Sequence, residues 1–92
     1  MDTIRWDERK NAWLKRHRGV CFEQAAVCLA SERVLDVIDH PNQDRYPGQK
    51  VAVIEINGDA YLVPYEHSGG EIVLMTMIPS RKATQTYMGV EE

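Results

Sequence analysis

The fold is decided by one stretch in the second half of the chain, KVAVIEINGDAYLVPYE at positions 50–66. Its two halves, 50–56 and 59–66, are rich in Val, Ile and Tyr, which favour strands. Asn57 and Gly58 between them form the pair that a two-residue type I′ turn prefers, because both turn positions need a positive φ. The stretch therefore predicts an antiparallel hairpin in which Ile56 pairs with Asp59.

Strands are also expected on both sides of this hairpin. Residues 34–39 predict one strand, which ends at the turn-rich segment 40–44. Residues 67–70 predict a turn that places Glu66 opposite Glu71 and begins a strand over 71–78. Pro79 ends that strand, and Ser80 can cap a short helix that runs to about Met88. Pro64 has no N–H to give to a ladder, so part of its strand should be irregular or unpaired.

The first third of the chain predicts two helices. Asp7 can cap a helix that runs to about His17, with Gly19 as its stop, and a second helix covers about 21–30. We expect Trp6, Trp13 and Leu14 to form the buried stripe of the first helix. The chain is thus expected to be a single α+β domain over 1–92, with two N-terminal helices packed on a three- or four-stranded antiparallel sheet and a short C-terminal helix.

In this register one face of the sheet carries an apolar strip that the two helices do not cover. The strip contains Val53, Leu62, Val73, Met75 and Met77, with Glu55 and Glu66 beside it. Exposed apolar patches on small proteins usually mark binding surfaces. We therefore predict that Glu55, Leu62, Met75 and Met77 bind a protein partner, and that the chain forms a homodimer when it is alone.

Composition limits the classes of function. The net charge of the 92 residues is -3, but positions 1–18 hold six of the eleven Lys and Arg residues. A site for a polyanion must therefore use the first helix or the pair Arg81-Lys82. Cys21 and Cys28 are expected to stay reduced. No metal-ligand spacing, phosphate-binding loop, signal peptide or long apolar run is present, so we expect no cofactor, no metal, no membrane segment and a cytoplasmic location.

Three short strings resemble one protein family. They are Trp6-Asp7-Glu8-Arg9-Lys10, Gly19-Val20-Cys21-Phe22-Glu23-Gln24-Ala25 and Arg81-Lys82-Ala83-Thr84. In this order and spacing they resemble the BrnT toxins of bacterial type II toxin–antitoxin pairs. The resemblance implies a RelE-like fold and a metal-independent ribonuclease that cleaves RNA and inhibits translation. It also implies neutralisation by a ribbon-helix-helix antitoxin of the BrnA type.

Metal-independent cleavage of RNA uses the ribose 2′-hydroxyl as nucleophile. It needs a base, cations to stabilise the phosphate, and an acid for the leaving oxygen. The resemblance indicates Arg81 and Lys82 as the catalytic cations. The candidates for the base are Glu55, Glu66, which lies near a glutamate of the family pattern, and His67, because a histidine can titrate near neutral pH. The alternative is that both cations are solvated or pair with the C-terminal carboxylates Glu91 and Glu92.

Two further residues are candidates for RNA binding. Lys10 matches a family lysine and is expected to contact phosphate, or else to cover tryptophan with its aliphatic stem. Arg45 lies near a basic position of the family.

The chain also departs from the family pattern at polar positions. Cys21 replaces a serine, Arg18 a histidine, Leu14 an asparagine, and Leu74 and Thr76 replace basic residues. These changes leave a second hypothesis open, in which the chain is a catalytically weak or inactive binding module that acts through its protein partner. A third hypothesis is a co-repressor that contacts DNA only through a partner.

Overall fold

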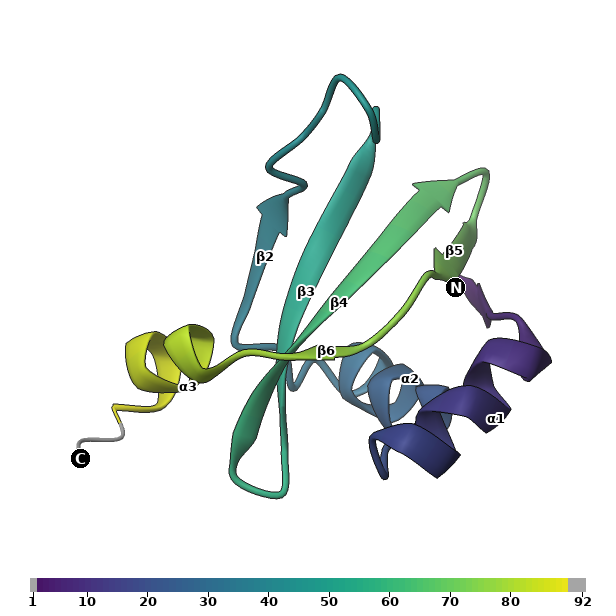
Figure 1. Ribbon diagram of the computed structural model, residues 1–92. Coiled ribbons are helices and arrows are strands. Elements are labelled where there is room, and N and C mark those ends of the chain that lie inside the picture. The colour runs from purple at the N-terminus through teal and green to yellow at the C-terminus, as the bar shows by residue number, and fades with distance from the viewer. Residues whose placement is uncertain (1, 90–92) are drawn as a thin grey trace.

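The computed structural model describes residues 2–89 and has an α+β fold of three helices and six strands. The elements in chain order are β1 (Thr3–Arg5), α1 (Glu8–His17), α2 (Phe22–Ala30), β2 (Asp36–Asp39), β3 (Gln49–Ile56), β4 (Asp59–Ser68), β5 (Glu71–Leu74), β6 (Ile78–Pro79) and α3 (Arg81–Met88). Figure 1 shows α1 and α2 together on one side of the molecule and α3 on the other.

The sheet is mixed and larger than expected. Its strand order is β1-β5-β4-β3-β2, and β6 also pairs with β4. All pairings are antiparallel except that between β1 and β5, which is parallel. The prediction of a purely antiparallel sheet of three or four strands is therefore wrong. One cause is β1, because a strand of three residues is too short to produce an alternation that can be recognised in the sequence. The other cause is that the predicted strand 71–78 is divided into β5 and β6.

The central hairpin has the predicted register, with Ile56 opposite Asp59. Asn57 and Gly58 have φ angles of 53° and 87°, as a type I′ turn requires. The next hairpin differs from the prediction because Gly69 and Gly70 alone make its turn, so that Ser68 lies opposite Glu71. The register is thus shifted by two residues. A shift of two leaves each side chain on its expected face.

The predicted strand 71–78 is interrupted between β5 and β6. Tyr65 pairs with Leu74, but Tyr61 pairs with Pro79, so four residues of β4 lie opposite five residues of the other chain segment. One extra residue reverses the side to which the following side chains point. Met77 was expected on the exposed strip, but it points into the core and is fully buried.

Pro64 lies at this interruption. Its carbonyl accepts a hydrogen bond from the Met75 N–H at 2.9 Å, so its backbone faces β5 and β6. The missing N–H of Pro64 therefore falls on the interrupted side, while its pairing with Val51 on β3 continues.

The main core lies between the two N-terminal helices and one face of the sheet. It contains Leu14, Val20, Phe22, Ala25, Ala52, Ile54, Ile56, Tyr61, Val63, Tyr65, Leu74 and Met77. A smaller cluster lies on the opposite face, where Ala83 of α3 contacts Val53 and Ala60 and is flanked by Leu62 and Met88. Within residues 2–89 no helix is long and apolar enough to span a membrane.

Trp13 is not part of the core, contrary to the prediction, and its side chain is 43% exposed. Asn11 and Leu14, which lie three positions apart on α1, face inward instead. Trp13 is rotated by about 100° from Leu14 around the helix axis and so reaches the surface.

Candidate functional site

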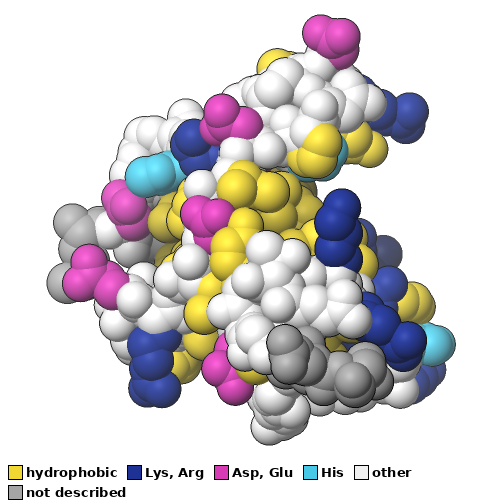
Figure 2. All heavy atoms as spheres, turned by 90° about the vertical axis from the view of Figure 1, so that its left-hand side faces the viewer, with side chains coloured by type: hydrophobic (Ala, Val, Ile, Leu, Met, Phe, Trp, Pro, Cys, Tyr) yellow, Lys and Arg dark blue, Asp and Glu magenta, His cyan; other side chains and the backbone are white. Residues whose placement is uncertain are grey.

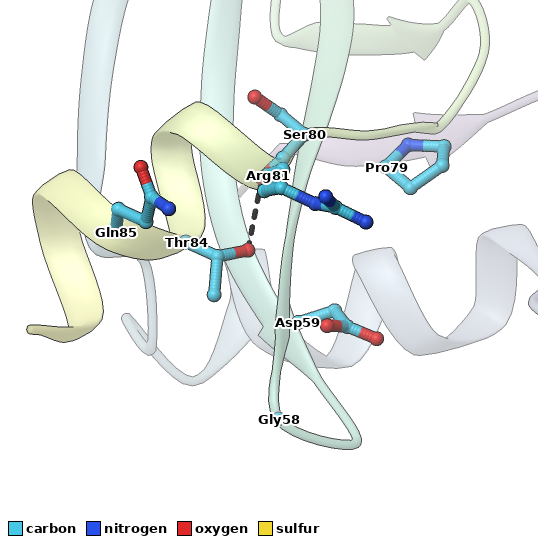
Figure 3. Close-up of a pocket in the computed structure, with 7 residues that line it drawn as sticks. All are labelled: Gly58, Asp59, Pro79, Ser80, Arg81, Thr84 and Gln85. Carbon is cyan, nitrogen blue, oxygen red and sulfur yellow. Dashed lines mark hydrogen bonds between the residues drawn. The ribbon is translucent and has the colours of Figure 1, made fainter. Parts of the chain in front are cut away.

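The segment Arg81-Lys82-Ala83-Thr84 divides into an exposed half and a buried half. Ala83 and Thr84 are buried, whereas Arg81 and Lys82 are exposed. The Thr84 hydroxyl accepts a hydrogen bond from the Ala60 N–H at 2.8 Å and donates one to the Ser80 carbonyl at 2.9 Å. The buried half therefore fixes the start of α3 to the start of β4, while Arg81 and Lys82 stay at the surface. Figure 3 shows Thr84 and Arg81 at this start of α3.

Arg81 lies at a hollow of about 430 Å³ lined by Gly58, Asp59, Pro79, Ser80, Arg81, Thr84 and Gln85. In Figure 3 the side chains of Arg81 and Asp59 extend to the same side of the hairpin. The carboxylate that accompanies Arg81 is thus Asp59, which the sequence analysis did not select. Lys82 lines a different and mainly apolar hollow, together with Ile38 and Leu62.

Glu66 and His67, the predicted bases, lie at the opposite end of β4 from Arg81. Ser80 donates its N–H to the Ala60 carbonyl, which fixes the start of α3 beside residue 60. Glu66 lies six positions after Ala60 along the strand, which corresponds to about 20 Å. His67 instead contacts Asp2, with 3.0 Å between Nε2 and Oδ2. The structure therefore does not bring the four predicted catalytic residues together in one site.

Two basic side chains of α1, Arg9 and Lys10, line a second hollow. Asp7 caps the helix, and its Oδ1 accepts the N–H groups of Arg9 at 2.7 Å and Lys10 at 3.3 Å. This cap fixes the first turn, which carries Arg9 and Lys10. The hollow beside it has a volume of about 560 Å³ and is lined by Asp7, Arg9, Lys10, Trp13, Arg18 and Thr76. We refer to this hollow as the α1 pocket.

Trp13 holds Arg18 at the α1 pocket and His17 at an adjoining hollow that Arg9, Ala12, Trp13, Arg16 and His17 line. The guanidinium carbon of Arg18 lies 4.9 Å from the centre of the Trp13 ring, a distance that permits a cation–π contact. The His17 ring stacks on Trp13 with the ring centres 4.5 Å apart. Arg18 also donates to the Met77 carbonyl, so its position is fixed from two sides. The α1 pocket thus combines three cations with an exposed aromatic ring.

Sequence reasoning selected only Lys10 from the α1 pocket. Arg18 was noted as a replacement for a family histidine, and it reaches the site because it follows the last turn of α1. Thr76 joins through the interrupted segment between β5 and β6, which no local sequence pattern predicts. Arg45 lies apart, in the loop between β2 and β3 at the top of Figure 1, with its guanidinium 5.7 Å from the Tyr46 ring.

Asn11 is a structural residue that the sequence analysis missed. Its side chain is buried, accepts the Phe22 N–H at 2.8 Å and donates to Glu23 at 2.8 Å. Asn11 therefore joins α1 to the start of α2. The hydrogen bond from Asn11 is the main cause that lowers the pKa of Glu23 below its ordinary value. A polar residue three positions before Leu14, on the buried stripe, is the signal that could have revealed it.

The residues predicted to bind a partner lie in different environments. Leu62 and Met75 are half-buried, Met77 is in the core, and Glu55 is exposed and lines a hollow beside Cys28 and Arg33. Between residues 2 and 89, no group of three or more His, Cys, Asp or Glu side chains could hold a metal ion.

The chain was compared with protein-family models, curated proteins and solved structures, and none of them matches it.

Proposed function

We propose that this chain acts on RNA as the toxin of a type II toxin–antitoxin pair, and that RNA binds at the α1 pocket. The single observation that carries the proposal is the convergence of Arg9, Lys10 and Arg18 on one hollow beside the exposed Trp13 ring. Cations bind the phosphate backbone, and an exposed aromatic or stacked arginine favours unpaired bases. Single-stranded RNA is therefore the substrate class.

The proposal includes cleavage without a metal and a RelE-like fold, as the resemblance to BrnT toxins implies. The cations of the α1 pocket would stabilise the negative charge that grows on the phosphate as the 2′-hydroxyl attacks. His17 stacks on Trp13, and its Nδ1 contacts the Trp13 carbonyl at 3.1 Å, so Nε2 is the ring nitrogen without that contact; this ring lines the hollow next to the α1 pocket. The antitoxin is proposed to be a ribbon-helix-helix protein of the BrnA type.

A second candidate function is an RNA-binding module with little or no cleavage, which acts through its protein partner. The separation of Arg81 from Glu66 and His67 favours it, because a cation and a base about 20 Å apart cannot act on one phosphate. Both candidates bind RNA at the α1 pocket, so they differ only in whether the bound RNA is cleaved.

Cleavage of a labelled single-stranded RNA in excess chelator separates the two candidates. The toxin proposal predicts cleavage that leaves a cyclic phosphate and stops when the 2′-hydroxyl at the cut site is removed. Lys10→Ala should lower the rate by about two to three orders of magnitude. Arg81→Ala should lower it less, because α3 lies on the other side of the molecule from α1 (Figure 1).

The other outcomes are equally informative. RNA that is bound but not cut would favour the binding module. A larger loss from Arg81→Ala than from Lys10→Ala would move the reaction to the Arg81–Asp59 hollow. A protein that neither binds nor cuts RNA would contradict both candidates.

A further inference from the structure

The second face of the sheet carries an apolar surface that α3 covers only in part. Pairing places Ile78, Leu62 and Val53 side by side across the sheet, and Pro64, Val51 and Ile38 in the next row. We call the partly exposed members of this face the outer strip, which consists of Ile38, Leu62, Val73, Met75 and Ile78. Figure 2 shows hydrophobic side chains gathered in a hollow on this side of the molecule, with acidic groups mainly on one flank and Lys and Arg groups on both.

The outer strip is too exposed to be explained as core. Ile38 and Ile78 are 39% and 40% exposed, although both are large and apolar. Contiguous apolar surface on a small protein usually marks a contact with another macromolecule. Met75 adds a flexible side chain that adapts to a partner.

The neighbouring sheet edge is partly blocked to a further strand, which favours the face as the contact surface. β2 is the edge strand, and the Asp36 carboxylate accepts the Val37 N–H at 2.8 Å and the Tyr87 hydroxyl at 2.7 Å. The Val37 N–H is thus already bonded to a side chain of its own strand and cannot pair with a further strand. A second β2 paired antiparallel would also bring Asp36 close to Asp39 of the other copy, and like charges in that position repel.

The charges at the two ends of the outer strip indicate which partner fits it. Lys82 belongs to α3 and lies at one end of the strip, where it lines the same hollow as Ile38 and Leu62. Glu66 lies on the same face at the other end of the strip. It follows Leu62 by four residues along β4, a distance of about 13 Å. None of the ion pairs found among residues 2–89 involves Lys82 or Glu66.

We infer that the outer strip is the interface of a homodimer with twofold symmetry. A twofold axis that passes through the middle of the strip, near Pro64, turns one copy end for end over the other. Glu66 of each copy then faces Lys82 of its partner, and the apolar side chains meet between the two ion pairs. A twofold interface repeats each contact, so one complementary pair of charges becomes two. This inference rests on the sheet face and is independent of any action on RNA.

Sedimentation of the purified chain over a range of concentrations tests the inference. The wild type should reach the mass of a dimer. Ile38→Lys should raise the dimer dissociation constant by about tenfold or more, because it places a charge in the apolar centre of the interface. Val37→Lys is the matched control, since Val37 is the next residue of β2, is 45% exposed, and points to the opposite face. It should remain dimeric.

Exchange of the two charges tests the symmetry. Glu66→Lys and Lys82→Glu should each weaken the dimer, because each sets two like charges against each other. An equimolar mixture of the two variants should recover a heterodimer, which has one native and one reversed ion pair. Circular dichroism and thermal unfolding of each variant separate lost association from lost folding.

Three results would overturn the inference. The first is a wild-type protein that stays monomeric at every concentration, which would assign the strip to a different protein. The second is an equal loss of dimer in Ile38→Lys and Val37→Lys. The third is a mixture of the charge variants that stays as monomeric as either variant alone.

Discussion

Replacement of Thr84 by valine should destabilise the protein although the two side chains have nearly the same shape. Thr84 is only 8% exposed, and its hydroxyl is the acceptor for the Ala60 N–H, whose residue is fully buried. Valine leaves that N–H without a partner, which costs about 1–3 kcal/mol. The Ser80 carbonyl loses its hydrogen bond from the hydroxyl. It keeps the hydrogen bond from the backbone N–H of residue 84, which is 3.0 Å long, so the carbonyl is not left without a partner. Threonine and valine have similar helix propensities, so propensity adds little.

The expected loss is therefore about 2 kcal/mol, which lowers the melting temperature of a domain of this size by about 8–16 °C. Chemical and thermal unfolding measure it. Thr84→Ser keeps the hydroxyl and should lose less. Thr86→Val changes an exposed residue of the same helix and should stay within about 0.5 kcal/mol of the wild type. A Thr84→Val protein as stable as Thr86→Val would refute the role of Thr84 as the anchor of α3.

Three more predictions follow from the contacts of α1, α2 and β3. Asn11→Leu should cost about 1–3 kcal/mol in urea unfolding, because it leaves the Phe22 N–H unpaired, and an unchanged midpoint would contradict the proposed link between the helices. The pKa of Glu23 is lowered in the folded state, so the stability it contributes is present at neutral pH and is lost as the pH falls through that pKa; Glu23→Gln should flatten the acid side of the stability profile. The pKa of Lys50 is raised by its hydrogen bond to Asp39. The stability that this contact contributes is therefore present below the unfolded pKa and is lost as the pH rises through the folded pKa. Asp39→Asn should abolish this loss when unfolding is measured at alkaline pH.

Local sequence signals predicted the parts of the fold that depend on neighbouring residues. The Asn57-Gly58 turn, the Asp7 cap of α1 and the Ser80 cap of α3 are all confirmed, because a turn or cap is determined within a few residues. The parallel pairing of β1 with β5 was missed because it joins segments more than sixty residues apart. Pairings of that kind depend on the packing of the whole chain.

The candidate site was predicted less well than the fold, for two physical reasons. The extra residue between β5 and β6 moves Met77 into the core and brings Thr76 to the α1 pocket, and only the pairing of β6 with β4 reveals it. The distance between Arg81 and Glu66 is long because Arg81 lies beside the start of β4 and Glu66 lies near its end. The spacing of motifs in the sequence does not specify this arrangement. Lys10 was selected from the sequence, and its position at the α1 pocket depends on the Asp7 cap, which lies three residues before it.

Binding of single-stranded RNA by two lysine variants decides whether the α1 pocket is the RNA site. Lys10 lines the α1 pocket, whereas Lys15 is an exposed lysine of the same helix that lies outside it. Lys10→Ala should weaken binding by about tenfold, the value of one charge-assisted hydrogen bond, and should lower the salt-dependence slope by about 0.7. Lys15→Ala should bind nearly as well as the wild type. Equal losses in the two variants, or RNA binding that neither changes, would contradict the assignment of the α1 pocket as the RNA site.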